Sequence, residues 1–285
     1  MSQSDTLIVP LTEYQQEVAA YWNTNTNDPV NLELGKIDDI YHHHYGLGEP
    51  DGAALEGPAE TRDARVIREL HRLETAQADY LLDRLGPLGA DDRVLDGGSG
   101  RGGTSIMCNA RFGCRVDGVS ISSYQVGFAN EQATRWSVSD RVQFHLKNML
   151  DTGFEGGDFS AIWTNETTMY VDLFDLYREF ARLLRKGGRY VCITGCYNDV
   201  LGTKSAAVEH IDQHYICKIH PRSQYFAALA ANGLVPIEVV DLTPATIPYW
   251  ELRNTSSVRT GIEDPFLSSY KDGSFQYLLI VAERL

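Results

Sequence analysis

Apolar and polar positions alternate along this chain in two rhythms, one typical of helices and one typical of strands. Between residues 59 and 86, Val66, Leu70 and Leu73 recur at helical spacing before Gly86, which predicts an amphipathic helix. Short apolar runs separated by helical segments follow, and they read RVLDGG, RVDGVS, VQFHL, FSAIWTN and RYVCITGC. Strands that alternate with helices predict an α/β fold built on a doubly wound parallel sheet. PIEVVDLT and QYLLIVAERL add two further strands near the C-terminal end.

The same pattern predicts how the chain is organised. Residues 1–57 are rich in aromatic residues, Asn and His and differ from the periodic remainder, so we expect an N-terminal helical lid segment there. Residues 58–285 should form one domain. Within it, the helix LFDLYREFARLLRKGG should end at Gly187 and Gly188. A helical insert, at about residues 200–233, should then lie over the carboxyl edge of the sheet.

The stretch VLDGGSGRGG, residues 94–103, places five glycines between a predicted strand and a predicted helix. Such a unit opens nucleotide-binding sheets, in which the amides of the turn and the helix N-terminus face the ligand. We expect Asp96 to orient the turn, and Gly97, Gly98 and Gly100 to let a ligand approach the backbone closely. A glycine-rich loop alone also fits a plain tight turn, so the next strands must decide.

The ends of the second and third strands carry neutral polar residues. Ser120, Ser122 and Gln125 stand where a dinucleotide-binding unit has an acidic residue for the ribose hydroxyls. Asn148 and Met149, after the third strand, suit the edge and the face of an adenine. A glycine loop followed by these two strand ends predicts an S-adenosylmethionine site.

The fourth strand ends at Asn165 and Glu166, which should face the reactive end of the cofactor, because ligands bind at the carboxyl ends of strands in open sheets. Trp163, Met169 and Tyr170 surround Glu166 in the sequence. An apolar setting raises a carboxyl pKa and suits a general base. The alternative is a carboxylate that the N-terminus of a helix stabilises.

Composition narrows the class of partner. The formal net charge is −14, the sequence has no basic run, and its pI is about 4.9, which argues against nucleic acid and anionic membranes as partners. The five cysteines are odd in number and lack metal-ligand spacing, as expected of buried thiols in a reducing cytoplasm. We find neither a secretory segment nor the roughly 18 apolar residues of a membrane span, and expect a soluble cytoplasmic protein.

Polar and aromatic residues are dense in three further segments. In YHHHYGLG, neighbouring side chains point apart, so either His42 and His44 or His43 alone can face a pocket; a surface loop is the alternative. The other two segments are the insert with Tyr215 and the stretch PYWELR. These aromatic residues either belong to the core or line a deep apolar pocket.

YHHHYGLG, SGRGG, NETTMYVDL, GGRYVCITGC and PYWELRNTSS closely resemble the geranyl diphosphate C-methyltransferases of 2-methylisoborneol biosynthesis. They are similar, more distantly, to cyclopropane-fatty-acid-synthase-like methyltransferases. The resemblance extends from about Tyr14 onward and matches the family's motif at Tyr45, Glu166 and the glycine loop. It implies a Rossmann-like class I methyltransferase sheet, S-adenosylmethionine as methyl donor, a prenyl diphosphate acceptor, Mg²⁺ with the diphosphate, and a homo-oligomer.

We expect Glu166 and Tyr45 to be the catalytic residues, and we also predict a set of substrate contacts. The expected diphosphate partners are Asn31, His42, His44, Tyr45 and Arg253, and the expected aromatic contacts of the prenyl group are Tyr45, Tyr170, Tyr215, Tyr249 and Trp250. At Tyr215 this chain departs from the carbon-2 enzymes, which carry phenylalanine in that pocket. The Mg²⁺ ligands stay open.

The reaction implied by this resemblance is alkene methylation at carbon 2 of geranyl diphosphate, with Glu166 removing a proton from the resulting carbocation. Three alternatives stay open: methylation at carbon 6, methylation of isopentenyl diphosphate, and a small-molecule or lipid methyltransferase of the same fold. A catalytically silent nucleotide-binding protein is a further alternative. If residues 1–48 form a lid, their removal should abolish prenyl diphosphate binding and leave the sheet folded.

Overall fold

The computed structural model describes residues 11–24 and 29–285, and its centre is a seven-stranded sheet in the order β3-β2-β1-β4-β5-β7-β6. The strands are β1 (Arg93–Gly97), β2 (Arg115–Ser120), β3 (Val142–Leu146), β4 (Phe159–Asn165), β5 (Leu184–Tyr197), β6 (Leu234–Asp241) and β7 (Phe275–Arg284). The predicted α/β class and all seven strands are confirmed.

The prediction of a parallel sheet is wrong for the last strand. β7 pairs antiparallel with both β5 and β6, whereas β1 to β5 pair in parallel. The chain leaves β6, forms two helices, and re-enters the sheet at Phe275, beside Tyr197 at the carboxyl end of β5. A strand that enters from this end has to run against its neighbours.

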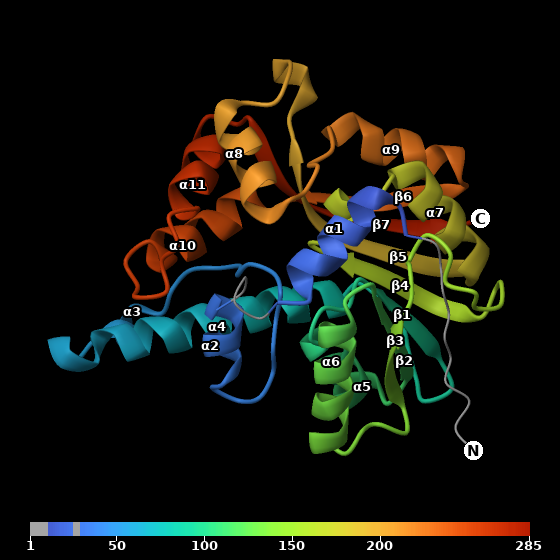
Figure 1. Ribbon diagram of the computed structural model, residues 1–285, viewed down its shortest axis with the longest axis horizontal. Helices are drawn as coiled ribbons and strands as arrows, with labels where there is room; N and C mark the ends of the chain where they lie inside the picture. Colours follow the sequence, from blue (N-terminus) through green and yellow to red (C-terminus); the bar gives the residue numbers. More distant parts are fainter. Residues whose placement is uncertain (1–10, 25–28) are drawn as a thin grey trace.

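Helices cover both faces of the sheet (Figure 1). The α-helices are α1 (Glu13–Trp22), α2 (Pro29–Gly35), α3 (Gly52–Leu55), α4 (Arg62–Leu82), α5 (Gly103–Phe112), α6 (Ser123–Arg135), α7 (Leu173–Leu183), α8 (Ala206–Tyr215), α9 (Arg222–Ala231), α10 (Thr243–Arg253) and α11 (Glu263–Lys271). Short 3₁₀ helices are η2 (Ala59–Thr61), η3 (Thr168–Tyr170) and η4 (Asp199–Leu201). The apolar sides of α4, α5 and α6 pack in one core, and those of α7 and α9 pack in a second core across the sheet.

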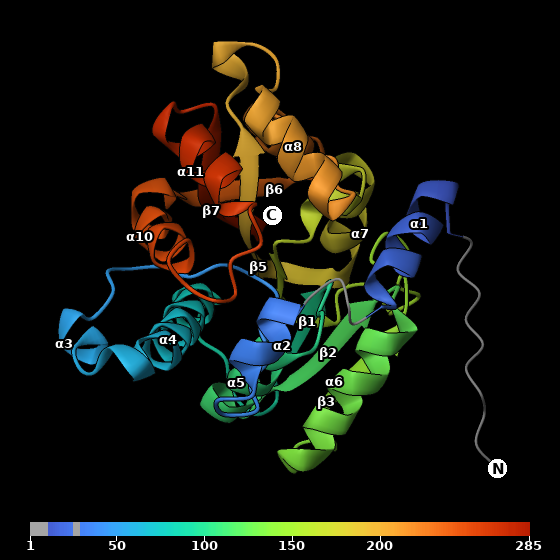
Figure 2. The same ribbon diagram turned by 60° about the vertical axis from the view of Figure 1, so that its left-hand side comes forward.

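Two predictions about the second half of the chain need correction. α7 ends at Leu183 instead of Gly187 and Gly188, because Leu184 is buried, takes an extended conformation and pairs with Phe159. Only part of the predicted insert lies over the carboxyl edge: α8 packs on α11 there, whereas α9 packs on α7 and β6 and flanks the sheet. α10 and α11 form a second helical layer that the sequence pattern did not reveal (Figure 2).

The N-terminal segment is fastened to distant parts of the chain. Val30 and Leu34 of α2, together with Leu47, pack in the same core as α4. α1 is held differently, by hydrogen bonds at both of its ends. The Tyr14 and Tyr21 hydroxyls donate to the carbonyls of Ile216 (2.9 Å) and His214 (3.2 Å), where α8 ends.

The C-terminal end of α1 meets the start of α6. The Ser122 hydroxyl donates to the carbonyl of Trp22 (3.0 Å) and to Oδ1 of Asn23 (2.9 Å), and the amide of Tyr124 also donates to Oδ1 of Asn23 (3.2 Å). α1 therefore joins α8, on one side of the carboxyl edge, to α6, on the other.

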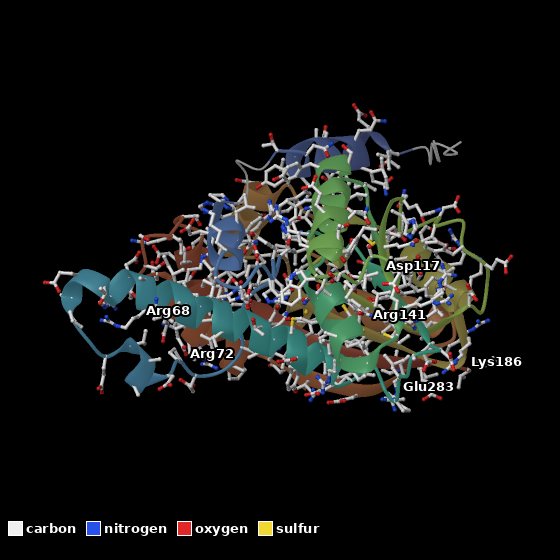
Figure 3. All side chains as sticks on the ribbon, turned by 90° about the horizontal axis from the view of Figure 1, so that it is seen from below. Arg68, Arg72, Asp117, Arg141, Lys186 and Glu283 are labelled. Atoms are coloured by element: carbon white, nitrogen blue, oxygen red, sulfur yellow. The ribbon has the colours of Figure 1, made fainter. Side chains whose placement is uncertain are left out.

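Charged residues on the outer surface lie at both ends of the molecule. Arg68 and Arg72 project from the exposed side of α4, and Arg141, Lys186 and Glu283 lie toward the opposite end of the molecule (Figure 3). All five cysteine thiols are free and buried. Within the described ranges, the longest helices are too short or too polar to cross a bilayer.

Candidate active site

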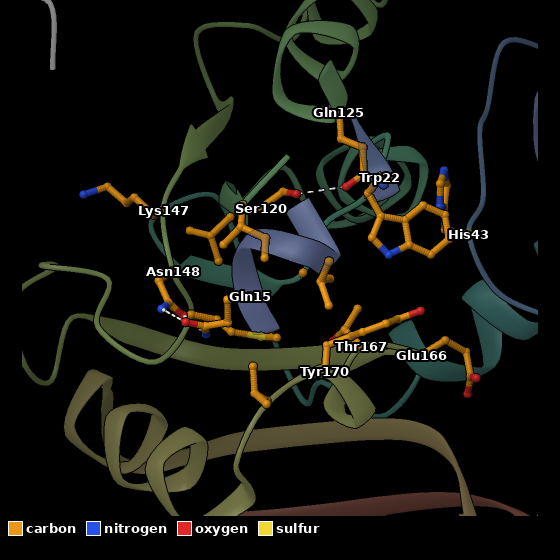
Figure 4. A pocket seen from close by; sticks show the side chains of 17 residues that line it. Gln15, Trp22, His43, Ser120, Gln125, Lys147, Asn148, Glu166, Thr167 and Tyr170 are labelled. Atoms are coloured by element: carbon orange, nitrogen blue, oxygen red, sulfur yellow. Dashed lines mark hydrogen bonds between the residues drawn. The ribbon is translucent and has the colours of Figure 1, made fainter. Parts of the chain in front are cut away.

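The first pocket, here called the glycine-loop pocket, lies at the carboxyl ends of β1, β2 and β3, as expected for an open α/β sheet (Figure 4). Its open space, including the solvent at its mouth, is about 660 Å³. Its lining residues are Gln15, Val18, Trp22, His43, Gly98, Gly100, Val119, Ser120, Ile121, Gln125, Lys147, Asn148, Met149, Glu166, Thr167, Tyr170 and Val171.

The glycines of the loop have two different structural roles. Gly98 (φ +89°) and Gly100 (φ +53°) line the pocket and take left-handed conformations that favour glycine. A Cβ at Gly98 would also lie 2.5 Å from Cγ2 of Thr167. Gly97 does not line the pocket; a Cβ there would lie 2.7 Å from the Phe180 ring, so this glycine makes room for packing under the sheet.

Most of the predicted strand-end residues meet in this pocket. Ser120, Gln125, Asn148 and Met149 line it, and the Ser120 hydroxyl donates to Oε1 of Gln125 (2.9 Å). Ser122 does not line it, because its hydroxyl caps α6 and holds α1.

Asn165 and Asp96 border a small neighbouring cavity, which meets the glycine-loop pocket at Gly98 and His43. Asn165 and Gln77 exchange two amide hydrogen bonds of 2.9 Å. Asp96 accepts from the Ser105 hydroxyl (2.7 Å), and burial raises its pKa to about 7.

α1 covers the glycine-loop pocket and belongs to the predicted lid segment, but sequence reasoning missed its pocket residues Gln15, Val18 and Trp22. Gln15 and Asn148 exchange amide hydrogen bonds of 3.3 and 3.2 Å, which brings α1 onto the end of β3. The Trp22 ring lies against His43 (5.5 Å between ring centres) and Tyr170 (6.3 Å). Lys147 was missed as well, although it directly precedes Asn148 at the strand end and could have been found there.

Neighbouring side chains of an extended segment point to opposite sides, and the three consecutive histidines follow this alternation. His43 faces the glycine-loop pocket. The prediction that His42 and His44 contact the substrate is wrong. Their rings are buried 4.7 Å apart, between centres, behind the glycine loop, and His42 also lies against His71. The surface-loop alternative is wrong too. Burial lowers the pKa of His42, His43 and His44, and the Arg101 guanidinium lowers that of His43 further, so these rings are neutral at neutral pH.

A second pocket, here called the aromatic pocket, lies beneath α8, α10 and α11, and its open space, including the solvent at its mouth, is about 770 Å³. Its lining residues are Trp22, Pro29, Val30, Asn31, His43, Tyr45, Glu166, Met169, Tyr170, Ile211, His214, Tyr215, Cys217, Ile219, Arg253, Thr260, Phe266 and Phe275. Asn31, Tyr45, Tyr170, Tyr215 and Arg253 are thus brought together as predicted.

Tyr249 and Trp250 are buried behind the wall of the aromatic pocket, and their prediction as substrate contacts is wrong. The Trp250 ring stacks on Phe266 (4.0 Å between ring centres) and supports Tyr45 (4.5 Å). The Tyr249 hydroxyl donates to Oε1 of Glu74 (2.7 Å). Both rings hold the wall in place.

Arg253 is a buried cation that faces this pocket. Its Nε lies 2.9 Å from Oε1 of Glu263, which is also buried. Glu263 accepts from the amides of Thr260 and Gly261 as well. Part of the Arg253 charge is therefore balanced inside the protein, which leaves less to attract an anion than the sequence suggested.

Glu166 is the carboxylate that the two pockets share. Burial raises its pKa to about 8, although hydrogen bonds with the Tyr277 hydroxyl and the Gly195 amide oppose the rise. Its φ of +55° is unusual for a residue with a side chain, and its amide donates to the carbonyl of Ile193 (3.0 Å). Its Oε1 is buried, and no partner among the described residues lies within hydrogen-bond distance.

Tyr45 stands in the aromatic pocket and is held from two sides. Its ring packs against Trp250 and Phe266 (5.0 Å between ring centres for the latter). Burial raises the pKa of its hydroxyl well above the usual value, and the neighbouring Tyr215 and Glu166 raise it further. The hydroxyl therefore stays protonated and can donate a hydrogen bond.

Trp22, His43, Glu166 and Tyr170 line both pockets. A ligand in the glycine-loop pocket and one in the aromatic pocket would meet at this junction, beside a buried carboxyl with an elevated pKa. Such a carboxyl can accept or donate a proton near neutral pH. The junction suits a group transfer between two ligands, coupled to movement of a proton.

Comparison with known proteins identifies the chain's relatives. A family model described as "Methyltransferase domain" matches residues 94–188. Geranyl diphosphate 2-C-methyltransferase of Saccharopolyspora erythraea is 60% identical over 272 residues, which is 95% of this chain and 95% of that protein.

Two solved structures are similar at 53% identity. A geranyl diphosphate C-methyltransferase from Streptomyces coelicolor A3(2), in complex with Mg²⁺, geranyl-S-thiolodiphosphate and S-adenosyl-L-homocysteine, matches with a TM-score of 0.95 over 97% of this chain and 99% of that chain. A geranyl diphosphate methyltransferase in complex with GPP and sinefungin matches with a TM-score of 0.94 over 96% of this chain and 100% of that chain. By sequence and by fold, over nearly its full length, this chain belongs to the geranyl diphosphate 2-C-methyltransferase family.

Proposed function

We propose that this protein transfers the methyl group of S-adenosylmethionine to carbon 2 of geranyl diphosphate. The observation that carries the proposal is the junction of the two pockets at Glu166, where a methyl donor and an alkene could meet beside a buried base. The glycine-loop pocket holds the cofactor, and the aromatic pocket holds the acceptor. Family membership supports carbon 2 over carbon 6 as the site of methylation.

S-adenosylmethionine supplies an electrophilic methyl group bonded to a positively charged sulfur. The π electrons of the carbon 2–carbon 3 double bond form the new carbon–carbon bond, the methyl–sulfur bond breaks, and positive charge appears at carbon 3 of the acceptor. Glu166 then takes the proton from carbon 2, whose bonding electrons restore the double bond. The unpartnered Oε1 is the atom that accepts this proton.

The walls of the aromatic pocket stabilise the cation and keep water away from it. Tyr45, Tyr170 and Tyr215 present ring faces or edges there, together with Phe266 and Phe275. A desolvated ring over a cation contributes about 1–2 kcal/mol. Trp250 acts only through Tyr45 and Phe266. A dry pocket also prevents water from trapping the cation before Glu166 removes the proton.

The diphosphate brings more negative charge than Arg253 alone can offset. Asn31 and Thr260 line the same pocket and offer the oxygen ligands that Mg²⁺ prefers. Within residues 11–24 and 29–285, no cluster of three or more His, Cys, Asp and Glu side chains could hold a metal ion. We infer that Asn31 and Thr260 hold Mg²⁺ jointly with phosphate oxygens and water.

Chelation of Mg²⁺ tests this arrangement together with the proposed reaction. With excess chelator, the KM of geranyl diphosphate should rise at least about tenfold, because the diphosphate charge loses its main counter-ion. S-adenosylhomocysteine affinity, measured by calorimetry, should not change and serves as the control. Formation of 2-methylgeranyl diphosphate, identified by NMR, checks the reaction itself. Full activity in excess chelator would show that protein groups alone hold the diphosphate.

The pKa of Glu166 predicts how the rate depends on pH. The carboxyl has to be ionised to act as a base, and burial raises its pKa to about 8. In the free enzyme, kcat/KM should therefore rise with pH and level off above about 8. The bound sulfonium favours the ionised form, so the midpoint of the kcat profile should lie at lower pH than that of kcat/KM. A profile that is flat across neutral pH would contradict the assignment.

Gly98→Val should abolish cofactor binding. Valine at φ +89° is strained by about 1–3 kcal/mol, and its Cβ would lie 2.5 Å from Thr167 at the edge of the pocket. We expect the Kd of S-adenosylhomocysteine to rise at least about tenfold. Gly127→Val in α6 is the matched control, because nothing lies within 4 Å of a Cβ there. An unchanged Kd for Gly98→Val would show that the cofactor does not bind at this loop.

The expected homo-oligomer and cytoplasmic location follow from the family resemblance and the free buried thiols, and both stay proposals. Light scattering on the purified protein and fractionation of cells would test them.

A further inference from the structure

The aromatic pocket has one polar wall and one apolar wall. His214, Arg253 and Thr260 are grouped around Glu263, and the Arg253 and Glu263 charges act on His214. Met169, Ile211, Cys217 and Ile219 are apolar residues of the same lining, and the Lys218 amide, between Cys217 and Ile219, donates to the Met169 carbonyl (2.9 Å). A prenyl diphosphate has its charge at one end and its hydrocarbon chain at the other. Its head group fits the polar wall, and its tail fits the apolar wall.

Behind the apolar wall lies another cavity, here called the outer cavity. It is bordered beneath α1 by Tyr14, Leu150 and Val171, and its polar rim consists of Thr12, Gln15, Asp172, Asp175, Lys218 and His220. Met169 and Tyr170 line both this cavity and the aromatic pocket, so they form the partition between the two. The Tyr170 hydroxyl is fixed on the Tyr215 carbonyl (3.4 Å), whereas the Met169 side chain is held by packing alone among the described residues.

We propose that Met169 sets the length of prenyl chain that the enzyme accepts. Its unbranched thioether closes the end of the pocket that would receive the tail, and removal of that thioether would join the aromatic pocket to the outer cavity. The space gained runs in the direction in which a chain longer by one isoprene unit would extend. The proposal rests on the proposed function, because it takes the aromatic pocket as the prenyl site.

The experiment compares geranyl and farnesyl diphosphate as acceptors for the full-length enzyme and for Met169→Ala. The ratio of kcat/KM for farnesyl to that for geranyl diphosphate should rise at least about tenfold in the variant, since one methylene of misfit alone changes discrimination by about 10–200-fold. Ile211→Ala is the matched control. Ile211 is a buried residue of the same apolar wall that does not border the outer cavity, so its truncation enlarges the pocket without opening it.

Met169→Val is tested in parallel, because it shortens the side chain and leaves a smaller hole if the alanine variant does not fold. S-adenosylhomocysteine affinity reports that each variant is folded. An unchanged ratio of kcat/KM for farnesyl to geranyl diphosphate in a folded Met169 variant overturns the proposal. An equal rise of this ratio in Ile211→Ala also overturns it, because it would mean that any enlargement of the pocket admits the longer chain. Failure of the wild-type enzyme to methylate geranyl diphosphate is a different result, and it would overturn the proposed function itself.

Discussion

Replacement of Glu166 by glutamine should lower turnover of geranyl diphosphate at least about 10²-fold, the lower end of what a positioned proton-transfer group contributes. Glutamine has nearly the same shape and can still meet the Tyr277 hydroxyl and the Gly195 amide, but it cannot take up a proton. S-adenosylhomocysteine affinity should stay near the wild-type value. Stopped assays with labelled methyl donor measure the rate, and calorimetry measures the affinity.

Tyr277→Phe is the informative companion to this variant. The Gln77 amide donates to the Tyr277 hydroxyl (2.9 Å), which in turn lowers the pKa of Glu166. Loss of that hydroxyl should raise the pKa of Glu166 further and move the rising limb of the pH profile to higher pH, with the base still present. Near wild-type turnover of Glu166→Gln would remove Glu166 from the role of base.

Removal of residues 1–24 should abolish methyl transfer and leave the sheet intact. α1 contributes Gln15, Val18 and Trp22 to the glycine-loop pocket, yet none of its residues belongs to the two hydrophobic cores. Trp22 is partly buried, and loss of its contact costs about 2 kcal/mol, so the Kd of S-adenosylhomocysteine should rise roughly 30-fold. Turnover should fall further, because water would enter the junction.

The longer deletion of residues 1–48 is a poor test, although the sequence suggested it. Leu34 and Leu47 pack in the core beside α4, and the Tyr41 carbonyl accepts a hydrogen bond from the Gly103 amide at the start of α5 (3.2 Å). That deletion would damage the sheet. The shorter deletion is checked by thermal unfolding: an unchanged midpoint with lost activity supports the role of α1, and retained activity would contradict it.

Sequence reasoning worked best where geometry is set by the sheet. The carboxyl ends of parallel strands meet at one edge, so Ser120, Asn148 and Glu166 could be placed together from strand boundaries alone. For the three consecutive histidines, the sequence allowed either His42 and His44 or His43 alone to face the pocket, and it could not decide between these two arrangements. The choice depends on where Tyr41 docks on α5, which is a contact between distant segments.

The errors at Tyr249 and Trp250 have a related cause. Aromatic residues on a helix such as α10 can face a pocket or the packing behind it, and contacts with distant helices decide. Phe266 of α11 stacks on Trp250, and Glu74 of α4 accepts a hydrogen bond from the Tyr249 hydroxyl. The lid segment was predicted, but the contacts of α1 were not, because α1 is attached by hydrogen bonds of Gln15, Tyr14 and Tyr21, which leave no periodic signal in the sequence.

The attachment of α1 to both α6 and α8 links the walls of the two pockets. Trp22 and Gln15 line the glycine-loop pocket, while Tyr14 and Tyr21 rest on the end of α8, whose His214 and Tyr215 line the aromatic pocket. If an acceptor that steadies α8 also steadies α1, it strengthens cofactor binding by some factor, and linkage requires the cofactor to strengthen acceptor binding by the same factor. The enzyme would then bind its two substrates cooperatively within one chain. By the same coupling, each product would slow the release of the other for as long as α1 stays in place.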